Sequence, residues 1–192
     1  VKSQRAAVMV MEVITKYLEG QLGLAVNKEK SQVAPAKDIE FLSFQVHQNK
    51  IRVGAKAKKR FKDKVRELTH RNNRYSMYQA VQQLNEFLRG WVGYFSIQQF
   101  QTIFKKLDDF IRNRLRSMQL KKWKKPAKFQ RMMIKAGVPV AEARKTWIRM
   151  KKWQSIKRVP VKIVLNLKWF RQKGLLFLDD YTQRNLELNF AR

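Results

Sequence analysis

Residues 76–95 read SMYQAVQQLNEFLRGWVGYF. Ser76 with Gln79 three positions later forms a capping box, which predicts the start of a helix. The apolar residues that follow recur every three or four positions, so one face of this helix is expected to be buried. That face comprises Val81, Leu84, Leu88, Trp91 and Phe95.

The two neighbouring segments carry matching apolar faces. Phe61, Val65 and Leu68 form a narrow stripe on a helix that is expected to start near Lys56. A longer stripe on the other side comprises Phe100, Ile103, Phe104, Leu107, Ile111, Leu115 and Met118. Because three amphipathic helices can bury such stripes against one another, the sequence predicts a small helical bundle at residues 55–120.

Gly90 and Gly93 lie inside the helix of residues 76–95, where each costs about 1 kcal/mol relative to alanine. Both fall with Arg89 on the face opposite the apolar stripe. They therefore predict a close approach to exposed backbone, either by another helix, which is the more ordinary explanation, or by a phosphodiester chain. The nearby Trp91 and Tyr94 are expected in the core rather than on a base-stacking surface.

Residues 1–54 differ in character from the bundle. Ser3 is suited to cap a helix that carries apolar residues three or four positions apart and ends near residues 20–23. β-prone runs follow at residues 24–26, 39–46 and 50–53, and residues 47–49 are typical of a hairpin turn. Val1 opens the chain within this pattern, as expected of a cut edge or of a start codon other than that for Met.

Residues 121–192 begin with a basic cluster around one aromatic residue, KKWKKP at residues 121–126. Two shorter helices are expected after it, at residues 127–136 with Gly137 as their stop, and at residues 139–152. Cations and tryptophans alternate again at residues 144–158. Lys and Arg neutralise phosphates while indole rings stack on bases, so this region predicts nucleic-acid binding.

The composition points to the same class of partner. Lys and Arg number 43 against 14 Asp and Glu, a formal net charge of +29 that calls for an anionic counterpart. The absence of cysteine excludes disulfides and thiolate metal sites, and His47 and His70 alone make no ligand set. No apolar run approaches the roughly 18 residues of a membrane span, so a location without membrane contact is expected.

Two acidic doublets resemble the carboxylate pairs of two-metal enzymes. Ion pairs on a helix surface, with Arg112 and Lys105, are the preferred explanation of Asp108-Asp109. Asp179-Asp180 is expected at a helix start, where acids cap the helix and complement its dipole. No catalytic residue is therefore predicted.

Several rare residues occur in an order that is typical of one family. Residues 60–69 read RFKDKVRELT, and LN, LRGW and YF follow at residues 84–85, 88–91 and 94–95. With this pattern the chain resembles the C-terminal part of a bacterial group II intron-encoded reverse transcriptase, or maturase, and the pattern continues at residues 107–112 and 123–124. Residues 24–31 and 41–44 are similar to the end of the palm, and residues 153–181 to the small DNA-binding module.

The resemblance implies a mainly α fold. Residues 55–120 would form a three-helix thumb bundle, residues 121–192 a basic helical DNA-binding module, and residues 1–54 a small α+β remnant of the palm. In the family, a Tyr-x-Asp-Asp strand lies just before the position of Ser3 and supplies the metal-binding aspartates. Neither catalytic residues nor a cofactor are therefore expected in this chain, and Mg²⁺ is expected only in the part that precedes it.

The resemblance also implies a function. The chain would grip an RNA template–DNA primer duplex and group II intron RNA for RNA-directed DNA synthesis and splicing, and its last module would contact target DNA. The primer grip would comprise Phe41, Leu42, Ser43 and Phe44, where the family usually has glycine at the position of Ser43. Backbone contacts are expected from Lys28, Lys30, Lys59, Lys62, Arg66, Arg89, Lys121, Lys122, Lys124, Lys125, Arg149 and Lys152, with Trp123 as a stacking residue.

Two alternatives remain open at this point. The chain could be one half of a split reverse transcriptase whose fingers–palm half carries the aspartates, or a free-standing RNA-binding splicing protein. A bacterial, cytoplasmic location, with or without association with the nucleoid, is expected in either case.

Overall fold

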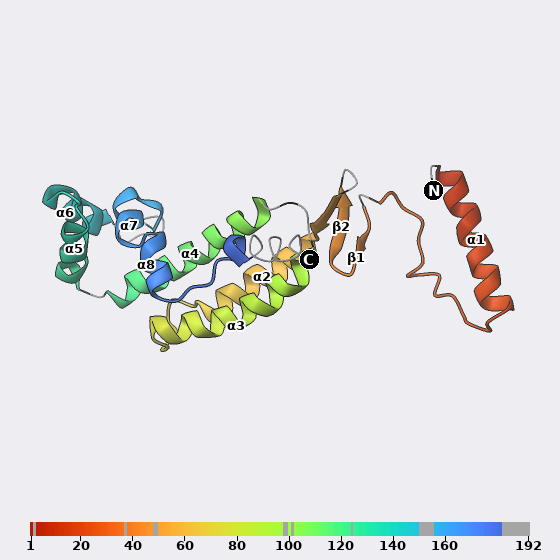
Figure 1. Cartoon of the computed structure of the whole chain (residues 1–192), viewed down its shortest axis with the longest axis horizontal. Coiled ribbons are helices and arrows are strands. Elements are labelled where there is room, and N and C mark those ends of the chain that lie inside the picture. Colours follow the sequence, from red (N-terminus) through yellow and green to blue (C-terminus); the bar gives the residue numbers. More distant parts are fainter. Residues whose placement is uncertain are drawn as a thin grey trace, which may run out of the picture. The chain divides into compact units, whose positions relative to one another are not determined.

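The computed structural model describes residues 1, 3–36, 38–47, 50–97, 100, 102–123, 125–149 and 156–181. The chain is mainly helical, with one small sheet near its N-terminus, which confirms the fold class (Figure 1). It divides into two compact units, the N-terminal unit Val1–Gly54 and the C-terminal unit Ala55–Arg192. Among the described residues, none of the helices combines the length and the apolar character that crossing a membrane requires.

The N-terminal unit opens with helix α1 (Gln4–Gly20), which Ser3 caps as predicted: its hydroxyl accepts the Ala6 N–H at 3.2 Å. The sheet comprises β1 (Glu40–Phe41), β2 (Phe44–His47) and β3 (Lys50–Val53) in antiparallel order β1-β2-β3. His47 pairs with Lys50, so β2 and β3 form the predicted hairpin, while Gln48 and Asn49 lie outside the described residues.

Two of the strand predictions are wrong in detail. Residues 24–26 form no strand, because the Leu24 N–H donates to the Leu18 carbonyl at 2.9 Å and folds this run back onto the end of α1. The run at residues 39–46 is split into β1 and β2. Leu42 and Ser43 adopt left-handed φ angles of 48° and 68°, and they form a two-residue turn between Phe41 and its partner Phe44.

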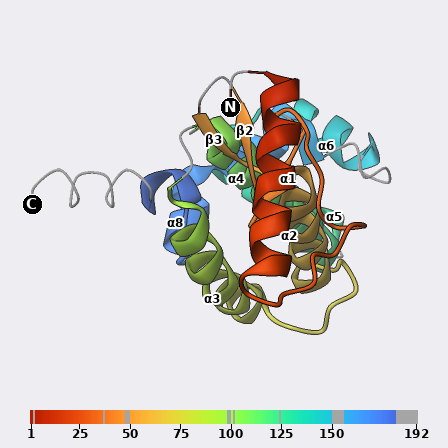
Figure 2. The same ribbon diagram turned by 90° about the vertical axis from the view of Figure 1, so that its right-hand side faces the viewer.

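The C-terminal unit contains the predicted bundle. It comprises α2 (Ala55–Leu68), α3 (Met77–Phe95) and α4 (Thr102–Lys122), and α2 packs against both other helices (Figure 1; Figure 2). The capping box of α3 is confirmed, since the Gln79 N–H donates to the Ser76 hydroxyl at 3.1 Å and the Ser76 N–H donates to the Gln79 side chain at 2.8 Å.

The core of the bundle is aromatic at one end and aliphatic along its length. The Trp91 ring centroid lies 4.5 Å from those of Phe61 and Phe95, and the ring meets Phe104 edge-on at 6.1 Å. The aliphatic part contains the fully buried Val65, Leu84, Leu88, Ile111, Leu115 and Met118. Full burial of one such side chain contributes about 1.5–3 kcal/mol, which explains why the apolar stripes alone predict this part of the fold.

A second cluster of helices follows the bundle. It contains α5 (Pro126–Lys135), α6 (Val140–Arg149) and α7 (Val159–Val164), which pack on one another around Phe129, Met133 and Val161 (Figure 1). Gly137, with a φ of +87°, follows α5 as predicted. The helix α8 (Leu167–Gln172) then leads to helical residues 178–181, where the described part of the chain ends.

Polar side chains of the bundle join it to residues 165–179. Asn85 on α3 donates to the Gly174 carbonyl at 2.7 Å and accepts the Leu176 N–H at 2.9 Å. Arg116 on α4 donates to the Leu165 carbonyl at 3.1 Å. The division between residues 120 and 121 stays a prediction, and α4 continues to Lys122.

Asp108 provides a third such link and corrects the surface ion pair that was predicted for it. The side chain is 4% exposed, and its two oxygens accept the N–H groups of Leu178 and Asp179 at 3.1 and 3.2 Å. Asp109 forms the helix-surface ion pair with Arg112 instead. Asp108 thus caps the helical turn at residues 178–181 across 70 residues of sequence.

Candidate nucleic-acid interface

The exposed face of α2 carries the first group of predicted contacts. Asp63 pairs with Arg66 at 2.5 Å and Glu67 with Lys64 at 2.8 Å. In the described part of the chain, no acidic side chain lies within 4.0 Å of Lys59 or Arg71. Both cations therefore remain available to an external anion.

Two of the predicted α2 cations are held over an aromatic ring. The Lys62 ammonium lies 5.9 Å and the Arg66 guanidinium 5.5 Å from the centroid of Phe110 on α4. At exposed sites such contacts contribute about 0.5–1 kcal/mol each, and they fix the direction of long side chains. Lys62 and Arg66 are therefore ordered yet exposed.

The face of α3 opposite the core is open. A Cβ atom added at Gly90 or at Gly93 would have no neighbouring atom within 4 Å, so packing of a described helix against these glycines, the more ordinary explanation, is wrong. Arg89 is exposed beside them. Tyr94 is 51% exposed and is not the core residue that was expected, whereas Trp91 is buried at 9%. We call Arg89, Gly90, Gly93 and Tyr94 the open face of α3.

A cluster of guanidinium groups, which the sequence analysis missed, lies at the C-terminal end of α2. Arg114 on α4 donates to the Thr69 hydroxyl at 3.2 Å and to the carbonyls of Arg66 and Thr69 at 3.3 and 3.2 Å. Burial, followed by the charges of Arg66 and Arg71, lowers the pKa of Arg114. A guanidinium that binds the last carbonyls of a helix complements its dipole. The prediction for α4 was based on its apolar residues alone, so it did not identify Arg114 as a residue that binds the end of α2.

The basic cluster at residues 121–126 divides into structural and exposed parts. Lys121 donates to the Asn72 side chain and Lys122 to the Tyr75 carbonyl, so both tie the end of α4 to the loop between α2 and α3. Trp123 is 6% exposed, with its ring centroid 5.7 Å from that of Phe129. Its predicted role in stacking is corrected, because the ring already fills the core between α4 and α5.

Other predicted contacts have less structural support. Lys125 is exposed at the start of α5. Lys124 and Lys152 lie outside the described residues, and Arg149 ends α6 with a side chain that is not described.

In the N-terminal unit, the hairpin of β1 and β2 presents the predicted primer grip. Phe41 is 73% and Leu42 65% exposed, while Ser43 and Phe44 are half-buried. The Gly54 N–H donates to the Ser43 carbonyl at 2.7 Å, which anchors the turn. Lys28 and Lys30 are exposed in a turn in which the Asn27 side chain accepts the N–H groups of Glu29 and Lys30 at 3.1 Å.

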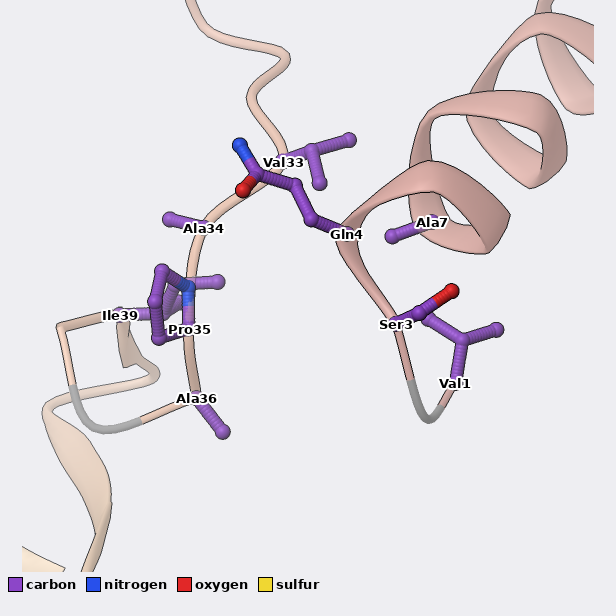
Figure 3. A pocket seen from close by; sticks show the side chains of 9 residues that line it. All are labelled: Val1, Ser3, Gln4, Ala7, Val33, Ala34, Pro35, Ala36 and Ile39. Carbon is purple, nitrogen blue, oxygen red and sulfur yellow. The ribbon is translucent and has the colours of Figure 1, made fainter.

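A pocket of about 560 Å³ lies between the start of α1 and residues 33–39. Figure 3 shows its lining, in which Ser3 and Gln4 are the polar side chains among Val1, Ala7, Val33, Ala34, Pro35, Ala36 and Ile39. None of the described residues that line it carries a charged side chain, so the pocket lacks the Lys or Arg side chains that commonly bind phosphate. In the described part of the chain, no group of three or more His, Cys, Asp or Glu side chains could hold a metal ion.

Comparison with known proteins identifies the bundle. Residues 58–136 match the family model described as group II intron, maturase-specific domain. This match covers α2, α3, α4 and α5, and it confirms the resemblance inferred from the sequence. No curated protein matches the chain.

Proposed function

Because the chain carries a group II intron maturase-specific domain at residues 58–136, which implies intron RNA as a partner, we propose that its C-terminal unit grips nucleic-acid backbone. The open face of α3 and the cations of α2 make the contact. The nucleic acids are group II intron RNA during splicing and a template–primer duplex during RNA-directed DNA synthesis, with target DNA as a further partner of residues 121–192.

The observation that carries the proposal is the open backbone at Gly90 and Gly93 next to Arg89. Two glycines inside a 19-residue helix cost about 2 kcal/mol together relative to alanine. The described structure offers no packing that would recover this cost. A phosphodiester chain that approaches within van der Waals distance of the helix backbone would recover it, because a methyl group at either position would hold the chain away.

The excess of cations supports a polyanionic ligand. The net charge of +29 greatly exceeds what solubility needs, and the surface of α2 presents Lys59 and Lys62 to solvent. Each phosphate that such cations neutralise contributes about −0.7 to −0.9 to the slope of log K against log salt. With several contacts, we expect a slope of about −4 or steeper for the purified chain.

In the N-terminal unit, we extend the proposal to the turn between β1 and β2, which would contact the primer. The exposed Phe41 and Leu42 at this turn support it, since two adjacent exposed apolar side chains offer a partner a contact surface. Lys28 and Lys30 would add backbone contacts.

The experiment that tests the proposal is the double substitution Gly90→Ala and Gly93→Ala. Both positions have free space and helical backbone, so we expect the variant to be more stable by about 1–2 kcal/mol in urea unfolding. Its affinity for a structured group II intron RNA should nevertheless fall about tenfold, or about 1.4 kcal/mol, in fluorescence anisotropy.

Gly20→Ala is the matched control, because Gly20 is also helical and also has no atom within 4 Å of an added Cβ, but it ends α1 in the N-terminal unit. This control should leave RNA affinity unchanged. A double variant that binds RNA as tightly as the unsubstituted chain would remove the open face of α3 from the interface, and a shallow salt slope of the unsubstituted chain would exclude backbone binding altogether.

A further inference from the structure

A second, smaller pocket lies in the cluster of α5, α6 and α7, outside the surfaces described above. It has a volume of about 360 Å³ and is bounded by the first turns of α6 and the start of α7. Its lining comprises Pro139, Ala141, Glu142, Lys145, Thr146 and Arg158. Two cations and a hydroxyl group therefore meet in one concave site.

The cations of this pocket are not neutralised within the described structure. Among the described residues, neither Lys145 nor Arg158 forms an ion pair within 4.0 Å, and Glu142, the acidic residue of the lining, pairs with neither of them. Together the three side chains carry a formal charge of +1. The pocket is therefore cationic even with Glu142 present.

The amino end of α6 adds to this charge. The Pro139 carbonyl accepts the Ala143 N–H at 2.9 Å, so proline occupies the N-cap position of a ten-residue helix. Proline has no side-chain acceptor, whereas the usual capping residues satisfy one of the free N–H groups of the first turn. The uncapped helix end adds the equivalent of about half a positive charge at the mouth of the pocket.

Thr146 is the independent sign of a ligand. Its side chain is 3% exposed, yet it lines the pocket, and its hydroxyl has no hydrogen-bond partner among the described residues. Because the Thr146 hydroxyl is not sealed from solvent in the described structure, it is available to a ligand that enters the pocket. A phosphate oxygen satisfies a hydroxyl donor, an ammonium and a guanidinium simultaneously.

We propose that this pocket of Lys145, Thr146, Arg158 and the amino end of α6 receives a phosphate group of the bound nucleic-acid backbone. The inference rests on the proposed function and names a group that the C-terminal unit binds at a site separate from the open face of α3. A phosphodiester carries a single negative charge, which matches a pocket of formal charge +1 with a helix amino end better than the double charge of a phosphate monoester does.

The first test removes both cations of the pocket, in the variant Lys145→Gln with Arg158→Gln. The control, Lys128→Gln with Lys162→Gln, removes the same charge from exposed positions on α5 and α7 that do not line the pocket. Affinity for the intron RNA is measured by anisotropy between 50 and 300 mM KCl. The pocket variant should make the slope of log K against log salt shallower by about 0.7–0.9, which corresponds to one phosphate contact, and the control by clearly less.

The second test keeps the charge and removes the hydroxyl. Thr146→Val retains the shape of the side chain and should lower the affinity about tenfold with an unchanged salt slope, as expected for a hydrogen bond to a charged group. Thr146→Ser, which keeps the hydroxyl, should retain most of the affinity. Far-ultraviolet circular dichroism of all variants separates a binding defect from unfolding.

The outcomes separate this inference from the proposed function. A shallow salt slope of the unsubstituted chain would refute backbone binding itself. A steep slope that the pocket variant shares with the unsubstituted chain would refute the pocket alone. Inorganic phosphate is the third probe. If millimolar phosphate shifts the NMR signals of Thr146 and Lys145, but neither variant changes the affinity for RNA, the pocket is a site for free phosphate. That outcome would overturn the inference.

Discussion

Replacing the buried Asp108 by asparagine should change how the stability of the chain depends on pH. Asp108 lies on α4 and accepts two N–H groups from the helical turn at residues 178–181. Burial is the largest influence on this carboxyl and raises its pKa, while the N–H groups of Leu178 and Asp179 and the charge of Arg112 oppose the rise. Asp179, which carries the same charge, adds to it, and the net result is a pKa of about 6.

The direction of the effect follows from the higher pKa in the folded state. The ordinary value is 3.8, so the folded chain binds this proton more tightly than the unfolded chain does. The stabilisation is complete below pH 3.8 and is lost as the pH rises through about 6. One pKa unit is worth about 1.4 kcal/mol, so the free energy of unfolding should fall by about 3 kcal/mol over this range on account of Asp108 alone.

Urea unfolding at pH 4, 5, 6 and 7, followed by circular dichroism, measures the free energy of unfolding of the unsubstituted chain and of Asp108→Asn. The other carboxyl groups titrate in both proteins, so the difference between the two isolates Asp108. We expect the asparagine variant to gain about 2.4 kcal/mol relative to the unsubstituted chain between pH 4 and pH 7. Asp109→Asn is the control, because it removes a carboxyl group that is 68% exposed from the next position of the same helix. A constant difference for Asp108→Asn would refute the reasoning from burial.

Two further predictions concern the backbone of each unit. Arg114→Ala removes three hydrogen bonds to the end of α2, and we expect it to lower the free energy of unfolding in urea by about 2 kcal/mol. Arg114→Lys should recover little of this loss, because an ammonium lacks the fork geometry of a guanidinium. A loss under about 0.5 kcal/mol in Arg114→Ala would mean that water replaces the guanidinium. Ser43→Gly should stabilise the turn between β1 and β2 by up to about 1 kcal/mol, because glycine adopts the φ of 68° without strain. Hydrogen exchange of the amides of β1 and β2 measures this stabilisation. Faster exchange in the variant than in the unsubstituted chain would contradict the prediction.

The sequence predicted those features that depend on residues close to one another along the chain. The capping box of Ser76 and Gln79, the cap at Ser3 and the apolar stripe of α3 each follow from spacings of three or four residues. The turn of Leu42 and Ser43 was missed because neither residue is one that usually tolerates a positive φ. The glycine that the resembling family usually has at the position of Ser43 is the residue that such a turn favours.

Links between distant residues could not be found in this way. Asn85, Asp108 and Arg116 contact residues between 49 and 91 positions away, and only for Asp108 had the sequence suggested a partner. That suggestion was an ion pair with Arg112 one turn away. In the structure Asp108 is buried and accepts the N–H groups of Leu178 and Asp179 instead, because buried N–H groups at the start of a helical turn need an acceptor.

For the candidate interface, the sequence predicted the kinds of residue involved but not which of them are exposed. The sequence identified an excess of cations and two glycines inside a helix, although its more ordinary explanation of the glycines, packing of another helix, was wrong for the described residues. It could not tell which cations serve the fold: Lys121 and Lys122 tie the end of α4 to a loop, and Arg114 caps α2. It also placed Trp123 on the surface, since an indole among lysines looks the same whether it faces solvent or Phe129.

The distribution of charge connects the stability of the C-terminal unit to its ligand. Burial lowers the pKa of Arg114 most, and the charges of Arg66 and Arg71 lower it further, so three guanidinium groups repel one another at the end of α2. Among these three, Arg66 is paired with an acidic side chain, Asp63, and that pair is half exposed. A phosphate group placed between them would reverse the sign of this interaction, because each cation would then have an anionic neighbour. We therefore expect the C-terminal unit to be most stable when a polyanion is bound, since the ligand supplies negative charge to a chain in which 43 basic residues face 14 acidic ones.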